Sequence, residues 1–318
     1  MVERAFGRVH FFFISSLCQN EVILQESLSM VELKNALVRA VINPRGAELT
    51  SLYNFATALE YMWSGDPAFW GKHSPVLFPV VGTLKDQTYF FQEKKYTLPR
   101  HGFARDRMFD IERQDANSVV FLLSDDNDSL MQYPFHFQLR LIYTLINNSL
   151  RLQYAVTNPG PDPLYFSVGG HPAFRVPLEK GLQYRDYELV FDRSENSGRW
   201  PISSEGLIET NPVPLLEHAN RLPLSHELFY RDALVFKDLS SQRLELRSAK
   251  STHGLSVEFD GFPFLGIWAA RDADFVCIEP WCGIADPVDS SQQLPEKEGI
   301  QQVAAGQSWE RSWQVTVY

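Results

Sequence analysis

Hydrophobic and polar residues alternate with a period of two through most of the chain, and few stretches have helical spacing. Phe135–Tyr143 alternates cleanly, and Leu150–Val156 repeats the pattern after a turn at Asn147 and Asn148. Successive side chains of a strand point to opposite faces of a sheet, so this pattern predicts a β-hairpin. Phe275–Glu279 is a continuous apolar run, which is typical of a buried strand.

The remaining pattern predicts short strands joined by turns. Tyr89–Leu98 has the pattern of a hairpin, Ser225–Arg231 that of one helical turn, and 194–216 that of a loop rich in proline, glycine and serine. About fifteen to twenty strands without a βαβ rhythm predict an all-β fold, a β-sandwich of large antiparallel sheets. No linker is long enough to divide this domain.

The first 29 residues differ from the rest. Arg4 and Arg8 precede the apolar run Val9–Cys18, which is too short to span a bilayer and lacks a small-x-small cleavage site. We therefore expect residues 1–29 to be a non-essential N-terminal extension and residues 30–318 to be the β-sandwich domain. A secretion signal is the alternative for this segment.

The composition excludes several kinds of partner. The net charge is −10 and no cluster of Lys or Arg occurs, which argues against nucleic acid and anionic membranes. Three cysteines are too few for a disulfide framework and fit a reducing compartment, so we expect a cytoplasmic protein. The histidines show no H-x-H or H-E-x-x-H pairing, and phosphate-binding glycine motifs are missing. We expect neither a metal centre nor a cofactor.

His171 lies in the stretch Leu164–Val176, LYFSVGGHPAFRV, where an apolar run ends in two glycines. The glycines allow close backbone approach, and Pro172 keeps His171 extended. A rigidly held imidazole that titrates near neutrality is the usual general acid or base. The alternative is a core histidine that is hydrogen-bonded to a backbone carbonyl.

Glu279 ends the apolar run Phe275–Glu279 and is followed by Pro280 and Trp281. A carboxylate at the end of a buried strand is costly unless it is paired or used. The setting copies that of His171, so the two residues could form an acid/base pair across a pocket. Glu279 could instead bond neighbouring backbone amides. Trp281 would offer a sugar ring an apolar face, or simply pack in the core.

Three further residues are candidates for substrate binding. His101 and Arg105 surround a glycine in PRHGFAR, and the guanidinium offers a planar fork of donors to sugar oxygens or phosphate. A structural ion pair with Asp106 or Asp110 is the alternative for Arg105. Asp232 precedes a short strand and could accept from hydroxyls, or serve as a cap.

The stretches PVLFPVVG (75–82), HGFAR (101–105), GGHPAF (169–174) and IEPW (278–281), in this order, resemble the aldose 1-epimerase (galactose mutarotase) family. The similarity covers residues 30–318 and is greatest to the uncharacterised aldose 1-epimerase-like branch. It implies a galactose mutarotase-like β-supersandwich with a carbohydrate cleft. It also implies that His171 protonates the ring oxygen, Glu279 takes the anomeric proton, and His101 and Asp232 contact the sugar.

One departure concerns the substrate. Well-studied mutarotases carry an Asn-Arg pair before the hairpin that leads to the second histidine, whereas Val81 and Gly82 occupy that place here. Arg105 could supply the missing donors, and the similar hexose-6-phosphate mutarotases use arginines to bind phosphate.

We therefore expect an isomerase that interconverts the α and β anomers of a hexose, as a monomer or homodimer. The alternatives are a hexose-6-phosphate mutarotase, a carbohydrate-binding protein without turnover, and a purely structural β-sandwich.

Overall fold

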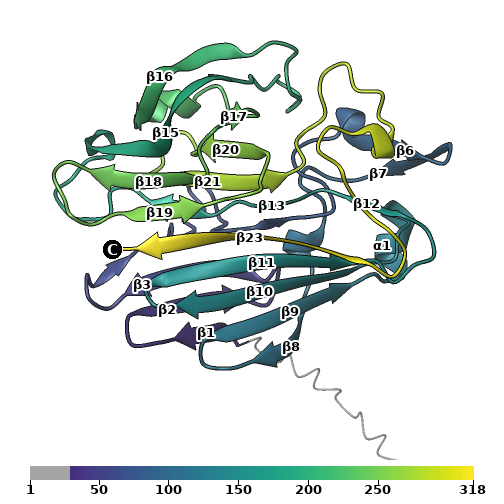
Figure 1. The fold of residues 1–318 in the computed structure, drawn as a ribbon, viewed down its shortest axis with the longest axis horizontal. Coiled ribbons are helices and arrows are strands. Elements are labelled where there is room, and N and C mark those ends of the chain that lie inside the picture. Colours follow the sequence, from purple (N-terminus) through teal and green to yellow (C-terminus); the bar gives the residue numbers. More distant parts are fainter. Residues whose placement is uncertain (1–28) are drawn as a thin grey trace, which may run out of the picture.

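The computed structural model describes residues 29–318, and its regular structure is almost entirely antiparallel β. The predicted extension 1–29 lies, except for its last residue, outside the described residues. Figure 1 shows large twisted sheets packed face to face, as the all-β prediction requires. No helix within residues 29–318 is long and apolar enough to cross a membrane.

The largest sheet has nine strands and runs from β16 at the top of Figure 1 to β8 at the bottom. In spatial order its strands are β16 (Val213–Pro223), β15 (Tyr187–Arg199), β18 (Arg243–Ser248), β19 (Leu255–Glu258), β23 (Ser308–Val317), β11 (Ser149–Thr157), β10 (Gln138–Ile146), β9 (Ser118–Ser124) and β8 (Asp110–Gln114). The expected hairpin is β10–β11, in which Leu139, Leu141 and Tyr143 are fully buried.

A six-stranded sheet carries the pocket. Its strands are β17 (Leu234–Phe236), β20 (Phe264–Trp268), β21 (Phe275–Cys282), β13 (Val168–Gly170), β14 (Ala173–Arg175) and β5 (Val76–Leu77). Strand β5 lies at the edge of this sheet and is followed by Pro79, a residue without a backbone N–H that a central strand would not tolerate.

Smaller elements complete the fold. The other strands are β1 (Val31–Lys34), β2 (Val38–Asn43), β3 (Glu48–Asn54) and β4 (Leu59–Glu60) in one sheet, and the pairs β6 (Thr88–Phe91) with β7 (Lys94–Thr97) and β12 (Leu164–Phe166) with β22 (Gln301–Val303). The α-helix is α1 (Asn127–Gln132), and the 3-10 turns are Lys85–Gln87, Ala104–Asp106, Tyr184–Asp186, His226–Phe229 and Leu294–Glu296. The helical turn within Ser225–Arg231 and the 89–98 hairpin are thereby confirmed.

The predicted loop at 194–216 is wrong at both ends. Strand β15 continues to Arg199, and β16 begins at Val213. The pairing of β15 with β16 contains register shifts, which are bulges or irregularities. An extra residue at a bulge breaks the alternation of hydrophobic and polar positions, so the sequence pattern did not indicate strands there.

The buried apolar side chains of residues 29–318 form two clusters. The main cluster spans most of the fold, and a smaller one lies at the pocket. The smaller cluster consists of Leu77, Val81, Ile208, Ala233, Val235, Phe264, Trp281, Ile284 and Ala285. It forms the apolar side of the pocket.

Candidate active site

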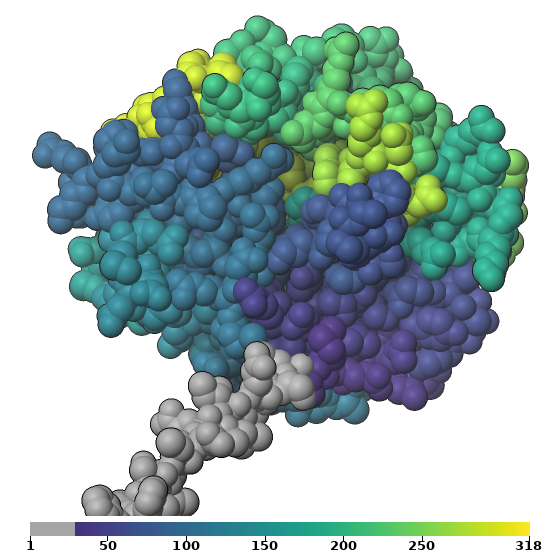
Figure 2. Space-filling model, turned by 180° about the vertical axis from the view of Figure 1, so that it is seen from behind, coloured from purple at the N-terminus to yellow at the C-terminus, as the bar shows by residue number. Residues whose placement is uncertain are grey.

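A pocket of about 310 Å³ opens on the outer face of the six-stranded sheet. Its lining comes from residues 70–105, from the 202–235 region and from β20–β21 with the loop after it. Figure 2 shows a face that is hollowed near its centre, where blue, green and yellow segments meet. The pocket brings together all six predicted site residues: His101, Arg105, His171, Asp232, Glu279 and Trp281.

His171 and Glu279 are cross-strand neighbours, rather than groups on opposite sides of a pocket as predicted. The register pairs on either side of them are Gly169–Trp281 and Ala173–Cys277. His171 lies midway between these pairs, so the antiparallel register places it opposite Glu279. His171 Nε2 lies 3.3 Å from Glu279 Oε2, and both side chains are buried.

Glu279 does not end its strand, because β21 continues to Cys282. Within β21, Phe275, Cys277, Glu279 and Trp281 alternate onto the same face. The strand therefore places a carboxylate between apolar side chains at the base of the pocket.

Burial sets the protonation of this pair. It lowers the pKa of His171 to about 3, with the charges of Arg100 and Arg105 acting in the same direction. Burial also raises the pKa of Glu279 well above its usual value. Burial therefore favours the neutral imidazole and disfavours the ionised carboxylate.

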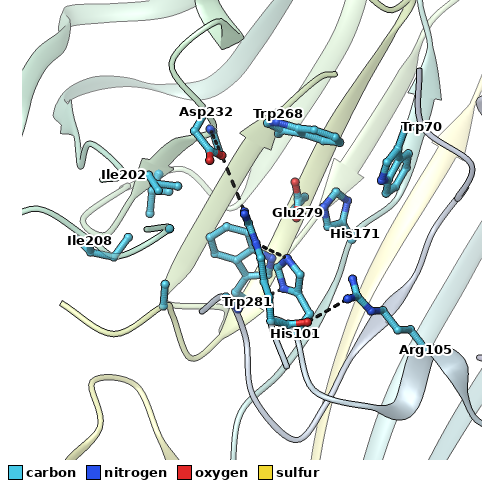
Figure 3. A pocket seen from close by; sticks show the side chains of 16 residues that line it. Trp70, His101, Arg105, His171, Ile202, Ile208, Asp232, Trp268, Glu279 and Trp281 are labelled. Atoms are coloured by element: carbon cyan, nitrogen blue, oxygen red, sulfur yellow. Dashed lines mark hydrogen bonds and ion pairs between the residues drawn. The ribbon is translucent and has the colours of Figure 1, made fainter. Parts of the chain in front are cut away.

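Two tryptophans that the sequence did not single out as site residues surround the His171 ring. Trp70 stacks on it at 5.0 Å between ring centroids, and Trp268 meets it edge-on at 5.6 Å. Figure 3 shows His171 between the two indoles, with Glu279 beside it. Trp70 lies just after the turn that Asp66 caps, and no local pattern distinguishes it from a core aromatic.

His101 is held against the backbone of Gly82. The backbone N–H of Gly82 donates to His101 Nδ1 at 3.1 Å, and the N–H of His101 donates to the Gly82 carbonyl at 2.9 Å. A neutral imidazole that accepts at Nδ1 carries its proton on Nε2. Burial, followed by the charge of His171, lowers the pKa of His101 well below its usual value, so the ring stays neutral.

Arg100 lines the pocket as well and was missed, although it precedes His101 in the chain. Its Nε lies 3.3 Å from His101 Nε2, and its Nη2 lies 3.8 Å from Asp232 Oδ1. A neutral imidazole accepts at only one ring nitrogen, so the contacts from Gly82 and from Arg100 to the His101 ring cannot both be hydrogen bonds.

Arg105 and Asp232 also make contacts within the protein. Arg105 Nη2 donates to the Arg100 carbonyl at 3.0 Å, and its Nε lies 3.7 Å from Asp106. Asp232 accepts from the backbone N–H of the next residue, Ala233, at 2.7 Å, which is not the N2 or N3 contact of a helix cap. Both side chains nevertheless reach the pocket.

Trp281 forms part of the pocket wall and lies against two glycines. A Cβ added to Gly169 or Gly266 would approach the indole to 2.6 or 2.4 Å, so glycine is needed at both positions. The aromatic faces of Trp70, Trp268 and Trp281 and the buried polar groups together suit a sugar ring.

Several buried polar atoms of the pocket have no hydrogen-bond partner among residues 29–318. They are His171 Nδ1, Glu279 Oε2, Trp281 Nε1 and Arg105 Nε. Buried polar atoms are normally satisfied, so these atoms indicate a place for a polar ligand.

Comparisons with known proteins agree with this geometry. The family model described as aldose 1-epimerase matches residues 29–315. Protein LacX of Lactococcus lactis subsp. lactis is 33% identical over 296 residues, covering 90% of this chain and 99% of LacX.

Two solved structures extend the likeness to the fold. A galactose mutarotase related enzyme from Lactobacillus acidophilus is 34% identical with a TM-score of 0.87, covering 91% of this chain and 97% of its own. A galactose mutarotase-like protein from Lactobacillus casei is 30% identical with a TM-score of 0.84, covering 91% and 100%. The chain therefore belongs to the aldose 1-epimerase family and is an isomerase with the galactose mutarotase-like fold.

Proposed function

We propose that the protein interconverts the α and β anomers of a free hexose, with Glu279 as base and His171 as acid. The observation that carries this proposal is the 3.3 Å approach of the two groups at the base of a pocket of sugar size. The anomeric oxygen and the ring oxygen of a pyranose share one carbon, so the base and the acid must be close together.

The proposed reaction uses only side chains of this chain. Glu279 takes the proton of the C1 hydroxyl while protonated His171 gives its proton to the ring oxygen, and the C1–O5 bond breaks. The C1–C2 bond rotates, and closure reverses both transfers. His101 donates Nε2–H to a sugar oxygen, Asp232, Arg100 and Arg105 bind hydroxyls, and Trp281 packs against the ring. No step requires a cofactor.

The protonation preference of the pair favours the intermediate. Ring opening starts from imidazolium and carboxylate, which hold the same number of protons as the neutral pair that burial favours. Opening converts the ion pair to the neutral pair, so burial favours the protonation state that accompanies the open-chain sugar. Selective stabilisation of species formed during the reaction accelerates it.

Polarimetry on freshly dissolved α-D-galactose and α-D-glucose tests the proposal. We expect wild type to accelerate equilibration, and His171→Ala and Glu279→Gln to lower kcat by about 10²–10⁴-fold. His136→Ala changes an exposed histidine paired with Asp125 and should leave the rate unchanged. Equal rates for wild type and both pocket variants on every aldose tried would refute the catalytic roles.

A hexose 6-phosphate is the second candidate substrate, favoured by two arginines in one pocket. If it is the substrate, the protein should equilibrate α-D-glucose 6-phosphate faster than glucose. Arg105→Ala should then lose this preference for the phosphorylated sugar. A binding protein without turnover would instead bind sugar equally well in Glu279→Gln and leave its anomers at the uncatalysed rate.

A further inference from the structure

We infer that His171, Cys277 and Glu279 form a binding site for a thiophilic divalent cation such as Zn²⁺, which excludes the sugar when it is bound. A ring nitrogen of His171, the thiol sulfur and a carboxylate oxygen all lie within 4.8 Å of one another, and all three residues are buried. The donor set of one nitrogen, one sulfur and one oxygen is that of zinc rather than of calcium or magnesium. This site shares His171 and Glu279 with the proposed sugar chemistry and adds Cys277, which that chemistry does not use.

The sheet places these ligands as a metal site requires. Cys277 and Glu279 are two residues apart on β21, so their side chains leave the strand on the same face. His171 enters from the adjacent strands, opposite Glu279 in the register. The prediction of no metal centre rested on spacing along the sequence, which does not detect ligands that meet across strands.

The observed spacing agrees with zinc geometry. Two ligand atoms ~2.0 Å from a tetrahedral zinc lie ~3.3 Å apart. His171 Nε2 and Glu279 Oε2 are 3.3 Å apart without a metal. The Cys277 sulfur lies within 4.8 Å of a ring nitrogen of His171 and of a carboxylate oxygen of Glu279.

The pocket supplies what the three side chains lack. Three protein ligands leave a fourth tetrahedral position, and Glu279 and His171 both face the cavity, from which a water could fill it. Glu279 Oε2 has no hydrogen-bond partner in the described part of the chain, so coordination would satisfy a buried oxygen that is otherwise unpaired.

Metal binding would occupy the lone pairs that proton transfer needs. The thiol loses its proton to solvent, as does the His171–Glu279 pair, and the metal takes their place. Neither side chain can then exchange a proton with a sugar. Zn²⁺ should therefore inhibit competitively, and a chelator should restore the activity.

Cobalt(II) titration of the purified protein tests the site. We expect one Co²⁺ per chain, with the visible bands of a tetrahedral ion and the ultraviolet charge-transfer band of a cobalt–thiolate bond. Added Zn²⁺ should abolish both.

The two buried cysteines of β21 provide a matched pair of variants. Cys277→Ala and Cys277→Ser should lose the charge-transfer band and bind Zn²⁺ at least tenfold more weakly. Cys282→Ala alters a buried free cysteine at the end of the same strand and should keep both. Circular dichroism checks that each variant is folded.

Failure of the site and failure of the proposed function are distinguishable. No cobalt–thiolate band in wild type, or a band that survives in Cys277→Ala, would overturn the metal site whatever the sugar assay shows. Mutarotation that micromolar Zn²⁺ inhibits in wild type and in Cys282→Ala, but not in Cys277→Ala, would support it. If mutarotation is not detected at all, the cobalt spectra still decide.

Discussion

At the scale of single residues, the buried carboxyl of Glu279 should reduce stability in return for function. Its pKa is raised well above its usual value, chiefly by burial, whereas in the unfolded chain it ionises near ~4.3. Between these two pKa values the unfolded state has lost a proton that the folded state keeps. The free energy of unfolding therefore falls as the pH rises, by up to ~1.4 kcal/mol per pH unit.

Glu279→Gln removes this dependence and should stabilise the protein while abolishing turnover. We expect the gain in the free energy of unfolding to be small at pH 4 and to grow toward pH 8. Urea unfolding of both proteins at several pH values measures it. A difference that stays constant or shrinks as the pH rises would contradict the raised pKa.

Trp70 is the residue whose contribution to His171 can be isolated. Its indole stacks on the imidazole at 5.0 Å with an angle of 27° between the rings, a contact worth ~1 kcal/mol that holds the imidazole in place. Trp70→Leu should therefore lower kcat about fivefold, and Trp70→Phe should retain most of the activity. Polarimetry under saturating sugar measures kcat; equal losses in both variants would show that the aromatic face is not what matters.

At the scale of elements, β20 needs glycine where Trp281 crosses it. A Cβ at Gly266 would lie 2.4 Å from the indole, so Gly266→Ala must displace Trp281 beside Glu279. We expect a loss of ~1–3 kcal/mol in the free energy of unfolding, together with a lower kcat.

Gly71→Ala is the control, because its nearest neighbour outside the adjacent residues would be 3.8 Å from the new Cβ. Urea unfolding and polarimetry should show both losses for Gly266→Ala and neither for Gly71→Ala. A fully active Gly266→Ala would show that the indole position does not affect the site.

The sequence predicted the strands in which hydrophobic and polar residues alternate regularly. Strict alternation identified β10 and β11, and the strand-end settings identified His171 and Glu279. The 194–216 region was taken for a loop because bulges break the period of β15 and β16. The direct contact of His171 with Glu279 depends on the register of separate strands, which local patterns do not contain.

Arg100, Trp70 and Trp268 were missed for a related reason. Trp70 and Trp268 lie in stretches without a chemical signature and join the site through tertiary packing, whereas Arg100 lies within PRHGFAR but was assigned no role. The family resemblance assigned roles only to the residues that match the functional positions of the family, and none of these three residues was among them.

At the scale of the whole molecule, a buried ion pair joins segments that form the pocket wall. Lys297 Nζ and Asp286 Oδ1 are 2.6 Å apart, and each side chain is only 3% exposed. Asp286 also accepts from the Lys85 N–H at 3.0 Å, and its backbone bonds Thr83 and Ile208. Asp286 thereby holds the segment after Gly82, which fixes His101, and the hairpin that carries Ile208.

Breaking one side of this pair should cost far more than replacing both sides. Asp286→Asn leaves the Lys297 ammonium buried without its counter-charge. Lys297→Met leaves the Asp286 carboxylate with the Lys85 N–H as its remaining partner. Each variant should lower the free energy of unfolding by ~3–5 kcal/mol. The double variant Asp286→Asn/Lys297→Met removes both charges, so its loss in the free energy of unfolding should be smaller than the sum of the two single losses. It should also raise KM, since the wall beside His101 loosens while His171 and Glu279 stay in register. A double-mutant cycle by urea unfolding, with polarimetry on the folded variants, measures both effects. Strictly additive losses would mean that the two charges do not stabilise each other.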